Sequence, residues 1–192
     1  MNYINLAAVR TCTEAEGPGK RFAIWCQGCY KKCPDCCNEK MQGLVPRYIV
    51  STEDIIDLIN KSLIENKIEG VTFLGGEPML QAEALCDIAR WCHLNNLSVI
   101  AFSGYLYSEL QQMNNNSVNK LLEQLDILID GPFIKEQIDT ERNWIGSKNQ
   151  IVHFFSDFYK PGIEFEKSEH KMEVLVSEKE LLMNGWPFIF KK

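Results

Sequence analysis

The stretch RFAIWCQGCYKKCPDC, residues 21–36, joins a short apolar run to a loop that is crowded with cysteines. The run Arg21–Cys26 carries the aromatic and β-branched residues that are typical of a buried β-strand. Gly28 follows it and allows a sharp turn, because glycine tolerates backbone conformations that other residues avoid. Three of the cysteines then come with the spacing C-x₃-C-x₂-C. The stretch therefore predicts a strand that delivers three thiols to one tight loop.

Five more apolar runs of the same kind predict further strands, and helical patterns lie between several of them. The runs are Ile4–Val9, Val71–Leu74, Ser98–Phe102, Asp126–Ile129 and Ile151–Phe155. Ser51 and Thr52 are suited to capping a helix, and apolar residues repeat every four positions from Ile55 to Leu63. We expect helices at about 52–66, 85–95 and 118–125, with a weaker pattern at 105–113.

The order of these elements predicts an α/β fold. From Val71 onward, strand starts lie about 24–28 residues apart with helices between them, which is the rhythm of βαβ units and of a parallel sheet. The units are too few for an eight-stranded barrel of about 250 residues, so we expect a partial (βα) barrel with a mostly parallel sheet. After Lys160-Pro161 the rhythm stops. Residues 172–176 and 181–182 there predict a short C-terminal β extension that ends in a turn at 184–185.

Composition and charge limit the possible functions. Hydrophobic residues make up 45% of the chain and charged residues 24%, as in an ordinary globular protein. With 20 Lys+Arg against 26 Asp+Glu the net charge is −6, which gives no general attraction to phosphate backbones or anionic membranes. No apolar run approaches the roughly 20 residues that cross a bilayer, and no secretion signal is recognisable. We therefore expect a cytoplasmic protein with no nucleic-acid or membrane partner, whose thiols stay reduced.

The eight cysteines fall into two groups. Five lie within twelve residues, namely Cys26, Cys29, Cys33, Cys36 and Cys37. Cys12, Cys86 and Cys92 are scattered, which favours a role as small buried hydrophobic residues. The histidines, His93, His153 and His170, show no metal-binding spacing, so we expect them on the surface or on helix faces.

Several kinds of site can be compared with the cysteine loop. A structural zinc site usually draws four ligands from two well-separated knuckles, whereas only three residues separate the two cysteine pairs here. The end of a bacterial ferredoxin run, C-x₂-C-x₂-C-x₃-C-P, matches Cys26 to Pro34, but Ala23 stands where its first cysteine would be. Simple packing of the thiols is a third alternative. We favour a [4Fe–4S] cluster held by three thiolates, whose fourth iron has no protein ligand and can bind a substrate.

The loop resembles that of radical S-adenosylmethionine (SAM) enzymes, and stretches on both sides of it match in the same order. Residues 17–29 look like the entry to the cluster loop in enzymes that activate glycyl-radical partners. Phe73-Leu74-Gly75-Gly76-Glu77-Pro78 follows a predicted strand and is similar to the family's G-G-E-P segment. Three later stretches resemble one subgroup, the activating proteins of anaerobic ribonucleotide reductase. These stretches are Ala101–Tyr105, Asp126–Phe133 and Trp144–Gln150.

The resemblance implies a ligand set for the cluster and a site for the amino group of SAM. The ligands would be Cys29, Cys33 and Cys36, with Cys37 only a neighbour. The methionine amine would be held by the segment made of Gly75, Gly76, Glu77 and Pro78. Glycines let the backbone approach a ligand closely, and carbonyl or carboxylate acceptors suit an ammonium group.

The remaining implied contacts involve strand ends and the cysteine loop. Ser103 and Asp130 would bond the ribose hydroxyls or the region of the methionyl carboxylate, and Asn149 is a weaker candidate for the same role. The residue before the third cysteine is often aromatic in the wider family and is Asp35 here, so backbone around Asp35–Cys37 would contact the adenine.

The function that the resemblance implies is reductive cleavage of SAM to a 5′-deoxyadenosyl radical. That radical would remove a backbone Cα hydrogen from a larger glycyl-radical enzyme, with flavodoxin or ferredoxin as the electron donor. Radical chemistry on a small molecule or a ribosomal peptide is an alternative, because substrate choice depends on loops. A non-enzymatic electron carrier is a second one. The resemblance covers a core at about residues 5–155 of one domain, 1–192, and leaves a C-terminal extension at about 156–192.

Overall fold

Four parallel strands form the centre of a seven-stranded sheet in the computed structural model, which describes residues 2–166, 171–176 and 181–185. They are β2 (Arg21–Cys26), β4 (Gly70–Gly75), β5 (Ser98–Phe102) and β6 (Ile127–Asp130). Antiparallel strands flank this centre: β1 (Tyr3–Thr13), β3 (Tyr48–Ser51) and β7 (Ile151–Phe154). The strand order is β3-β1-β2-β4-β5-β6-β7. The predicted α/β class with a parallel sheet centre is confirmed, and the described strands do not close into a barrel.

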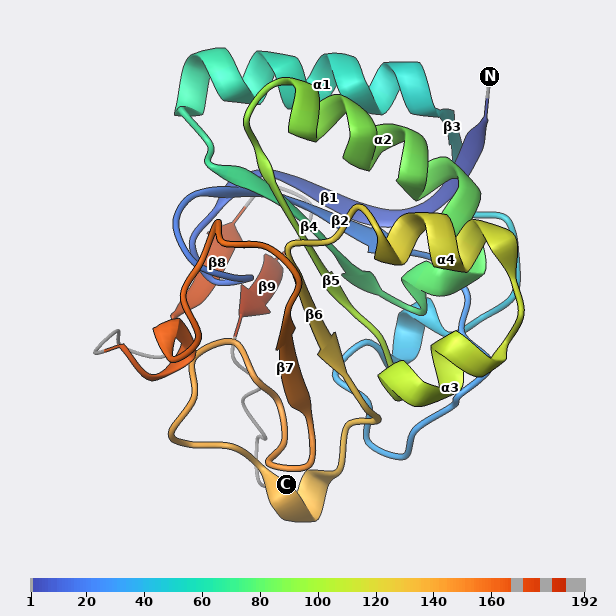
Figure 1. Ribbon diagram of the computed structural model, residues 1–192, viewed down its shortest axis with the longest axis vertical. Helices are drawn as coiled ribbons and strands as arrows, with labels where there is room; N and C mark the ends of the chain where they lie inside the picture. Colours follow the sequence, from blue (N-terminus) through green and yellow to red (C-terminus); the bar gives the residue numbers. More distant parts are fainter. Residues whose placement is uncertain (1, 167–170, 177–180, 186–192) are drawn as a thin grey trace.

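The α-helices gather on one side of the sheet, as Figure 1 shows for α1, α2 and α4. The α-helices are α1 (Thr52–Asn66), α2 (Ala82–Leu94), α3 (Tyr107–Gln112) and α4 (Asn116–Leu122). Short 3₁₀ turns are η1 (Glu39–Met41), η2 (Pro78–Gln81), η3 (Lys135–Gln137) and η4 (Ile163–Phe165). The predicted cap is confirmed, because Ser51 Oγ accepts a hydrogen bond from Asp54 N at 3.1 Å. Among the residues that the structure describes, no helix is long and apolar enough to cross a membrane.

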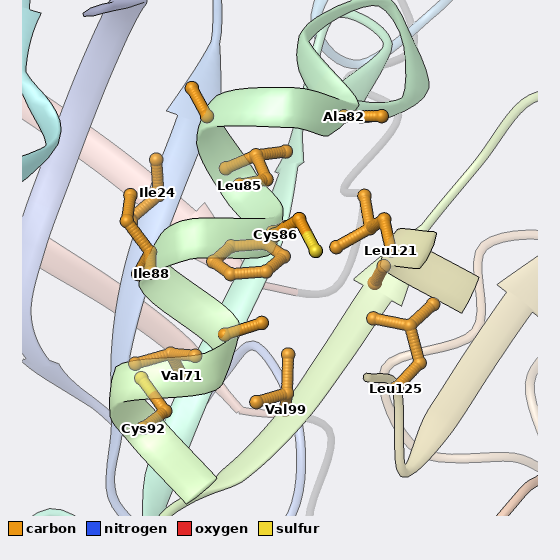
Figure 2. Close-up of a cluster of buried hydrophobic side chains, with 14 of the residues drawn as sticks. Ile24, Val71, Ala82, Leu85, Cys86, Ile88, Cys92, Val99, Leu121 and Leu125 are labelled. Carbon is orange, nitrogen blue, oxygen red and sulfur yellow. The ribbon is translucent and has the colours of Figure 1, made fainter. Parts of the chain in front are cut away.

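The central strands are buried on both faces, and alternate residues serve two different environments. Phe22 and Ile24 of β2 join the core that packs under the helices, whereas Ala23 and Trp25 belong to a second cluster on the opposite face. Figure 2 shows the helix-side core, where Cys86 of α2 packs among apolar side chains. Cys92 lies in the same core, which confirms the buried packing role predicted for Cys86 and Cys92, whereas Cys12 is only half-buried against that core.

Three features differ from the sequence-based expectation. β7 pairs antiparallel with β6, whereas the strand rhythm predicted another parallel unit; the connection 131–150 contains only a 3₁₀ turn, so the chain returns along the neighbouring edge. The four-residue strand β3 was not predicted, because no alternating pattern extends beyond it. The expected terminal turn is part of a strand: β8 (Met172–Val176) pairs antiparallel with β9 (Leu181–Gly185) in a separate two-stranded sheet.

A fully buried arginine fastens the amino-terminal end of the parallel strands. Arg21 Nε donates to Thr72 Oγ1 at 2.6 Å, and its Nη1 donates to Ser98 Oγ at 3.0 Å and to Tyr159 Oη at 3.0 Å. Nη2 donates to the carbonyl of Val71 at 2.6 Å. These bonds join β2, β4 and β5 to the segment after β7 at the edge of the sheet opposite to the cysteine loop.

Candidate functional site

A cavity of about 320 Å³ lies at the carboxyl ends of the parallel strands, where ligands bind in parallel α/β folds. The segments after β2, β4, β5 and β6 all contribute to its lining. Seven of the predicted site residues line it, namely Cys29, Cys33, Cys36, Cys37, Gly75, Gly76 and Ser103. Five others do not appear in that lining: Asp35, Glu77, Pro78, Asp130 and Asn149. The topology therefore unites sequence stretches that are more than seventy residues apart.

The shape of the cysteine loop depends on residues with positive φ and on backbone hydrogen bonds to the segment at Met41 and Gln42. Gly28 has φ +101°, as the predicted sharp turn requires, and Lys32 and Asp35 have φ +48° and +53°. The amide of Gly28 donates to the carbonyl of Met41 at 2.7 Å, and that of Cys29 donates to the carbonyl of Gln42 at 3.0 Å. The loop is thus fixed by backbone hydrogen bonds at its entry.

The three predicted ligand cysteines all line the cavity. Cys29 is buried, and Cys33 and Cys36 are half-buried. Burial raises the pKa of Cys29 and of Cys33, whereas a hydrogen bond from the Cys37 thiol lowers the pKa of Cys36 to about 6. Within the described ranges no three His, Cys, Asp or Glu side chains are placed so that they could hold a single metal ion. Three cysteines that line one cavity nevertheless provide the soft donors that iron–sulfur clusters use.

Cys26 differs from these three thiols. It is fully buried at the end of β2 and packs in the helix-side core, and burial raises the pKa of its thiol. The five closely spaced cysteines of the sequence therefore divide into one packed thiol, Cys26, and four that line the cavity.

The Gly75-Gly76 pair lets β4 approach the cysteine loop. Gly75 has φ +104°, and a Cβ built on Gly76 would lie 2.3 Å from the carbonyl oxygen of Gly28. The amides of Gly76 and Glu77 donate to the carbonyls of Cys26 and Gly28, both at 2.8 Å. We expected the two glycines to let the backbone approach a ligand closely. In the structure they let β4 approach the backbone of the cysteine loop, and both also line the cavity.

Glu77 connects the ends of β4 and β5 through its side chain. It is fully buried, and its Oε1 accepts hydrogen bonds from Ser103 Oγ at 3.0 Å and from Met79 N at 3.1 Å. Its Oε2 accepts a hydrogen bond from Gly104 N at 2.8 Å. Burial raises the pKa of Glu77 to about 7, and the three hydrogen bonds oppose this shift. Pro78, next to it, opens η2 and is buried.

Ser103 and Asp130 occupy corresponding strand ends but different surroundings. Ser103 lines the cavity, and its hydroxyl both donates to Glu77 and accepts from Tyr105 N at 3.1 Å. The Asp130 carboxylate accepts from Tyr107 N at 2.6 Å and lies 3.0 Å from His153 Nε2. The structure therefore places Ser103 in the same cavity lining as the cysteine loop. Asp130 lies outside that lining and contacts Tyr107 and His153.

The loop between β6 and β7 forms another wall and is braced by the predicted Trp144–Gln150 stretch. Gln150 Oε1 accepts from the amides of Gly146 and Ser147, both at 3.0 Å, and its Nε2 donates to the carbonyl of Gly131 at 3.1 Å. Asn149 Nδ2 donates to the carbonyl of Pro132 at 2.8 Å, and its Oδ1 is buried without a hydrogen-bond partner.

Asp35 and the two described histidines are not part of the cavity lining. His93 of α2 pairs with Asp126 at 3.2 Å, while His153 lies on β7 and is mostly buried, in contrast to its expected surface or helix position. His170 lies outside the described residues. Asp35 is exposed and pairs with Lys135 at 3.0 Å, which links the cysteine loop to η3.

Several cavity residues were not identified from the sequence. Trp25 and Phe102 alternate with helix-side core residues along their strands and therefore lie on the other face of the sheet. This alternation was the only trace of their position in the sequence. Trp144 has φ +58°, which is unusual for a bulky side chain and is not recognisable from sequence. Lys31 and Arg10 are the charged side chains that bring positive charge to the lining within the described part of the chain.

The C-terminal hairpin supplies a further wall. Met183, Asn184 and Gly185 of β9 line the cavity beside Glu16. Glu16 Oε1 accepts from Gly185 N at 2.8 Å and from Asn184 Nδ2 at 3.3 Å, and burial raises the pKa of Glu16 to about 7. The extension without a recognisable motif thus contacts the site directly, which only its tertiary position reveals.

Comparisons with known proteins point to one family. Residues 15–153 match the protein family described as "4Fe-4S single cluster domain". The chain is similar to the anaerobic ribonucleoside-triphosphate reductase-activating protein of Vibrio cholerae, with 32% identity over 148 residues that cover 73% of this chain and 91% of that protein. Proteins of the same name from Escherichia coli K12 and phage T4 are 28% and 24% identical, covering 71% and 77% of this chain and 90% and 92% of theirs.

Proposed function

The chain belongs to the family of anaerobic ribonucleoside-triphosphate reductase-activating proteins with a 4Fe-4S single cluster domain, and on that premise we propose that it is a radical SAM enzyme. Its substrate is a glycine Cα–H bond in a larger anaerobic ribonucleotide reductase, which it converts to a glycyl radical. One observation carries this proposal: the cysteine loop, the Gly75-Gly76 segment and Ser103 line a single cavity.

Cys29, Cys33 and Cys36 are the residues that hold the cluster. Their sulfur atoms suit iron, they face the cavity together, and Cys37 is the exposed neighbour of the third one. A cluster held there would, when reduced, supply the one electron needed for cleavage of the C5′–S bond of SAM to methionine and a 5′-deoxyadenosyl radical. Flavodoxin or ferredoxin is the proposed electron donor.

The chain's own groups bind and orient SAM. The Gly75–Pro78 segment holds the methionine amine through backbone carbonyls, because the Glu77 carboxylate is committed to Ser103, Gly104 and Met79. Backbone around Asp35–Cys37 contacts the adenine. Apolar side chains such as Trp25 and Phe102 form the wall behind the ligand and exclude water from a reactive radical.

Asp130 and Asn149 support the proposed site through hydrogen bonds, although neither lines the cavity. Asp130 fixes the β6 end through the Tyr107 amide, and Asn149 holds the Pro132 carbonyl, so both set the position of the loop that carries Gly131 and Gln150. We further propose that residues 1–192 act as one domain in the cytoplasm, and that its sheet is the open part of a partial (βα) barrel.

Anaerobic reconstitution tests the proposal. We expect one cubane cluster per chain, a change in its electron spin resonance spectrum on addition of SAM, and 5′-deoxyadenosine after reduction. Addition of an anaerobic ribonucleotide reductase should then yield a glycyl-radical signal on that protein. An unchanged spectrum with SAM would favour an electron carrier. SAM cleavage without a radical on the reductase would favour a small-molecule or peptide substrate.

A further inference from the structure

An exposed apolar surface follows the β3 edge of the seven-stranded sheet. β3 is the last strand on that side, next to β1 and close to the amino terminus in Figure 1. Large apolar side chains there are each more than half exposed. These side chains, which we call the edge patch, are Tyr3, Leu44, Val45, Tyr48 and Ile49. Exposed apolar residues that gather in one place on a protein surface mark an interaction site, whereas single ones are ordinary.

Asn5 of β1 holds the edge patch together. Its backbone is paired with Ile49 in the sheet. Its Nδ2 donates to the carbonyl of Val45 at 2.9 Å, and its Oδ1 accepts a hydrogen bond from Arg47 N at 2.9 Å. Tyr3, two residues before Asn5, is the diagonal neighbour of Ile49 across the strands. The patch is therefore one continuous surface on a fixed backbone.

The peptide groups of Ile49 face the open edge of the sheet. In an antiparallel pair, residues that exchange hydrogen bonds alternate with residues that do not. Thr52 N donates to the Asn2 carbonyl at 3.0 Å, so in this register the even-numbered residues of β3 bond to β1. Asn5, opposite Ile49, turns its own amide and carbonyl to the Gln81 side chain, at 2.6 and 2.9 Å. Ile49 thus presents one N–H and one C=O to an added strand.

The edge patch begins at the rim of the cavity. Met41 and Gln42 line the cavity, and Leu44 follows two residues after Gln42. A Cβ built on Gly28, at the entry to the cysteine loop, would lie 3.2 Å from Leu44 Cδ2. The patch is therefore continuous with the lining of the proposed site.

β3 also begins level with the carboxyl end of β2. Leu6 of β1 pairs with Tyr48 on one side and with Cys26 on the other. Neighbouring strands lie about 4.8 Å apart, so a strand added to β3 would lie about 14 Å from β2. About four or five extended residues cover that distance. A chain that is bound along β3 can therefore continue into the cavity.

The size of the edge patch favours an extended segment of a transient partner over a second copy of this chain. Its five half-exposed side chains offer on the order of 500–600 Å², less than the roughly 800 Å² that each partner buries in a stable complex. β3 is only four residues long, so it can form few hydrogen bonds with another strand. An enzyme that acts on a protein must also release it after the reaction, which a small contact permits.

We propose that the edge patch binds an extended segment of the partner reductase beside its target glycine, as an additional strand on β3. The inference rests on the proposed function, which makes a glycine Cα–H bond of the reductase the substrate. A glycine has no side chain, so an enzyme must recognise it through the backbone and the flanking residues. Ile49 supplies the backbone hydrogen bonds, and Tyr3 and Tyr48 contact side chains of the added strand.

Binding measurements with two variants of one residue test this surface. Dissociation constants are measured anaerobically on cluster-loaded protein, for an anaerobic ribonucleotide reductase and for a fluorescent peptide that spans its target glycine. Ile49→Asp brings a charge into the apolar contact and should weaken both at least about tenfold. Ile49→Pro removes the outward N–H but no bond to β1, and it should weaken both by about threefold to tenfold.

A matched variant controls for the substitution itself. Ile64 of α1 is 71% exposed, and Ile64→Asp makes the same change outside the edge patch. It should bind the reductase and the peptide as the wild-type protein does. Iron content and thermal unfolding of each preparation verify that the variants are folded and loaded.

The outcomes separate this inference from the proposed function. Wild-type affinity in both Ile49 variants overturns the inference, and so does weakening by Ile49→Asp alone, which would mean contact without an added strand. Dimerisation of the wild-type protein that Ile49→Asp abolishes, with reductase binding unchanged, assigns the edge to a second copy and also overturns it. A wild-type protein that forms no glycyl radical on the reductase refutes the proposed function instead.

Discussion

The cysteines of α2 and those of the loop after β2 show how one side chain serves two purposes in the same fold. Cys92 lies on the helix side of the sheet, is fully buried among apolar residues, and burial raises the pKa of its thiol to about 12. Cys36 lies at the carboxyl edge, faces a cavity, and has its pKa lowered to about 6. Position relative to the parallel strands, rather than residue type, therefore decides which thiols reach the cavity. The low pKa is particular to Cys36 among the three candidate ligands, because it comes from the hydrogen bond of the Cys37 thiol, whereas burial raises the pKa of Cys29 and Cys33.

The largest expected effect is the loss of the cluster when a ligand cysteine of the loop is substituted. Cys33→Ala should abolish cluster assembly, because it reduces the proposed ligand set from three thiolates to two. Iron and sulfide analysis with visible absorbance after anaerobic reconstitution measures the loss. Cys37→Ala is the matched control and should keep the cluster nearly intact. Assembly in Cys33→Ala together with its loss in Cys37→Ala would reverse the ligand assignment.

A second prediction uses the buried carboxyl that joins the two strand ends of the site. Because burial raises the pKa of Glu77 from its ordinary 4.5 to about 7, the folded protein binds this proton more tightly than the unfolded chain does. Its contribution to stability is complete below about pH 4.5 and is lost as the pH rises to about 7. Glu77→Gln should therefore reduce the fall in unfolding free energy between pH 5 and pH 8 by on the order of 3 kcal/mol.

Denaturant unfolding at several pH values measures that slope. Glu65→Gln, an exposed change on α1, is the charge-matched control and should leave the slope as it is in the wild-type protein. Glu16 titrates in the same range and keeps part of the slope in both variants. An identical slope in Glu77→Gln and wild type would show that the carboxyl is not held as the structure places it.

A third prediction concerns how closely β4 approaches the cysteine loop. Gly76→Ala puts a methyl group 2.3 Å from the Gly28 carbonyl oxygen, so the loop must shift, at a cost of roughly 1–3 kcal/mol in unfolding free energy and with a loss of cluster occupancy. Gly43→Ala adds the same methyl group where the nearest atom is 3.5 Å away, and it should change neither quantity. Equal iron content in both variants would contradict the close approach.

The smallest expected effect is on stability, from substitution of the packed cysteine Cys92 in α2. Cys92→Ala removes only a buried sulfur atom, so we expect a loss of about 1 kcal/mol in unfolding free energy and a normal cluster. Thermal unfolding and iron content of the same preparation measure both. If Cys92→Ala failed to assemble a cluster, the assignment of Cys92 to packing alone would be wrong.

Sequence patterns predicted the parts of the fold that depend on local periodicity. The continuous apolar runs gave β2, β4, β5 and β6, and the Ser51 cap with its repeating apolar face gave α1, because burial on two faces or on one stripe leaves a direct trace in the sequence. The strand β7 was predicted but its antiparallel direction was not, since strand spacing does not distinguish a helical crossover from the irregular connection at 131–150.

The candidate site was predictable where it follows directly from strand ends. Cys29, Cys33, Gly75 and Ser103 each come shortly after a predicted strand, and parallel strands bring such positions to one edge. The engagement of Glu77 with Ser103 and the wall formed by β9 could not be foreseen, because both depend on contacts between segments far apart in the chain.

The wall contributed by β9 has a consequence for the order in which the cavity forms. During synthesis, the loop with Cys29 leaves the ribosome long before Asn184 and Gly185, which bond to Glu16 at the far side of the cavity. Until those last residues dock, the pocket has an open flank. This side of the cavity is therefore walled only once β9 has folded back onto Glu16.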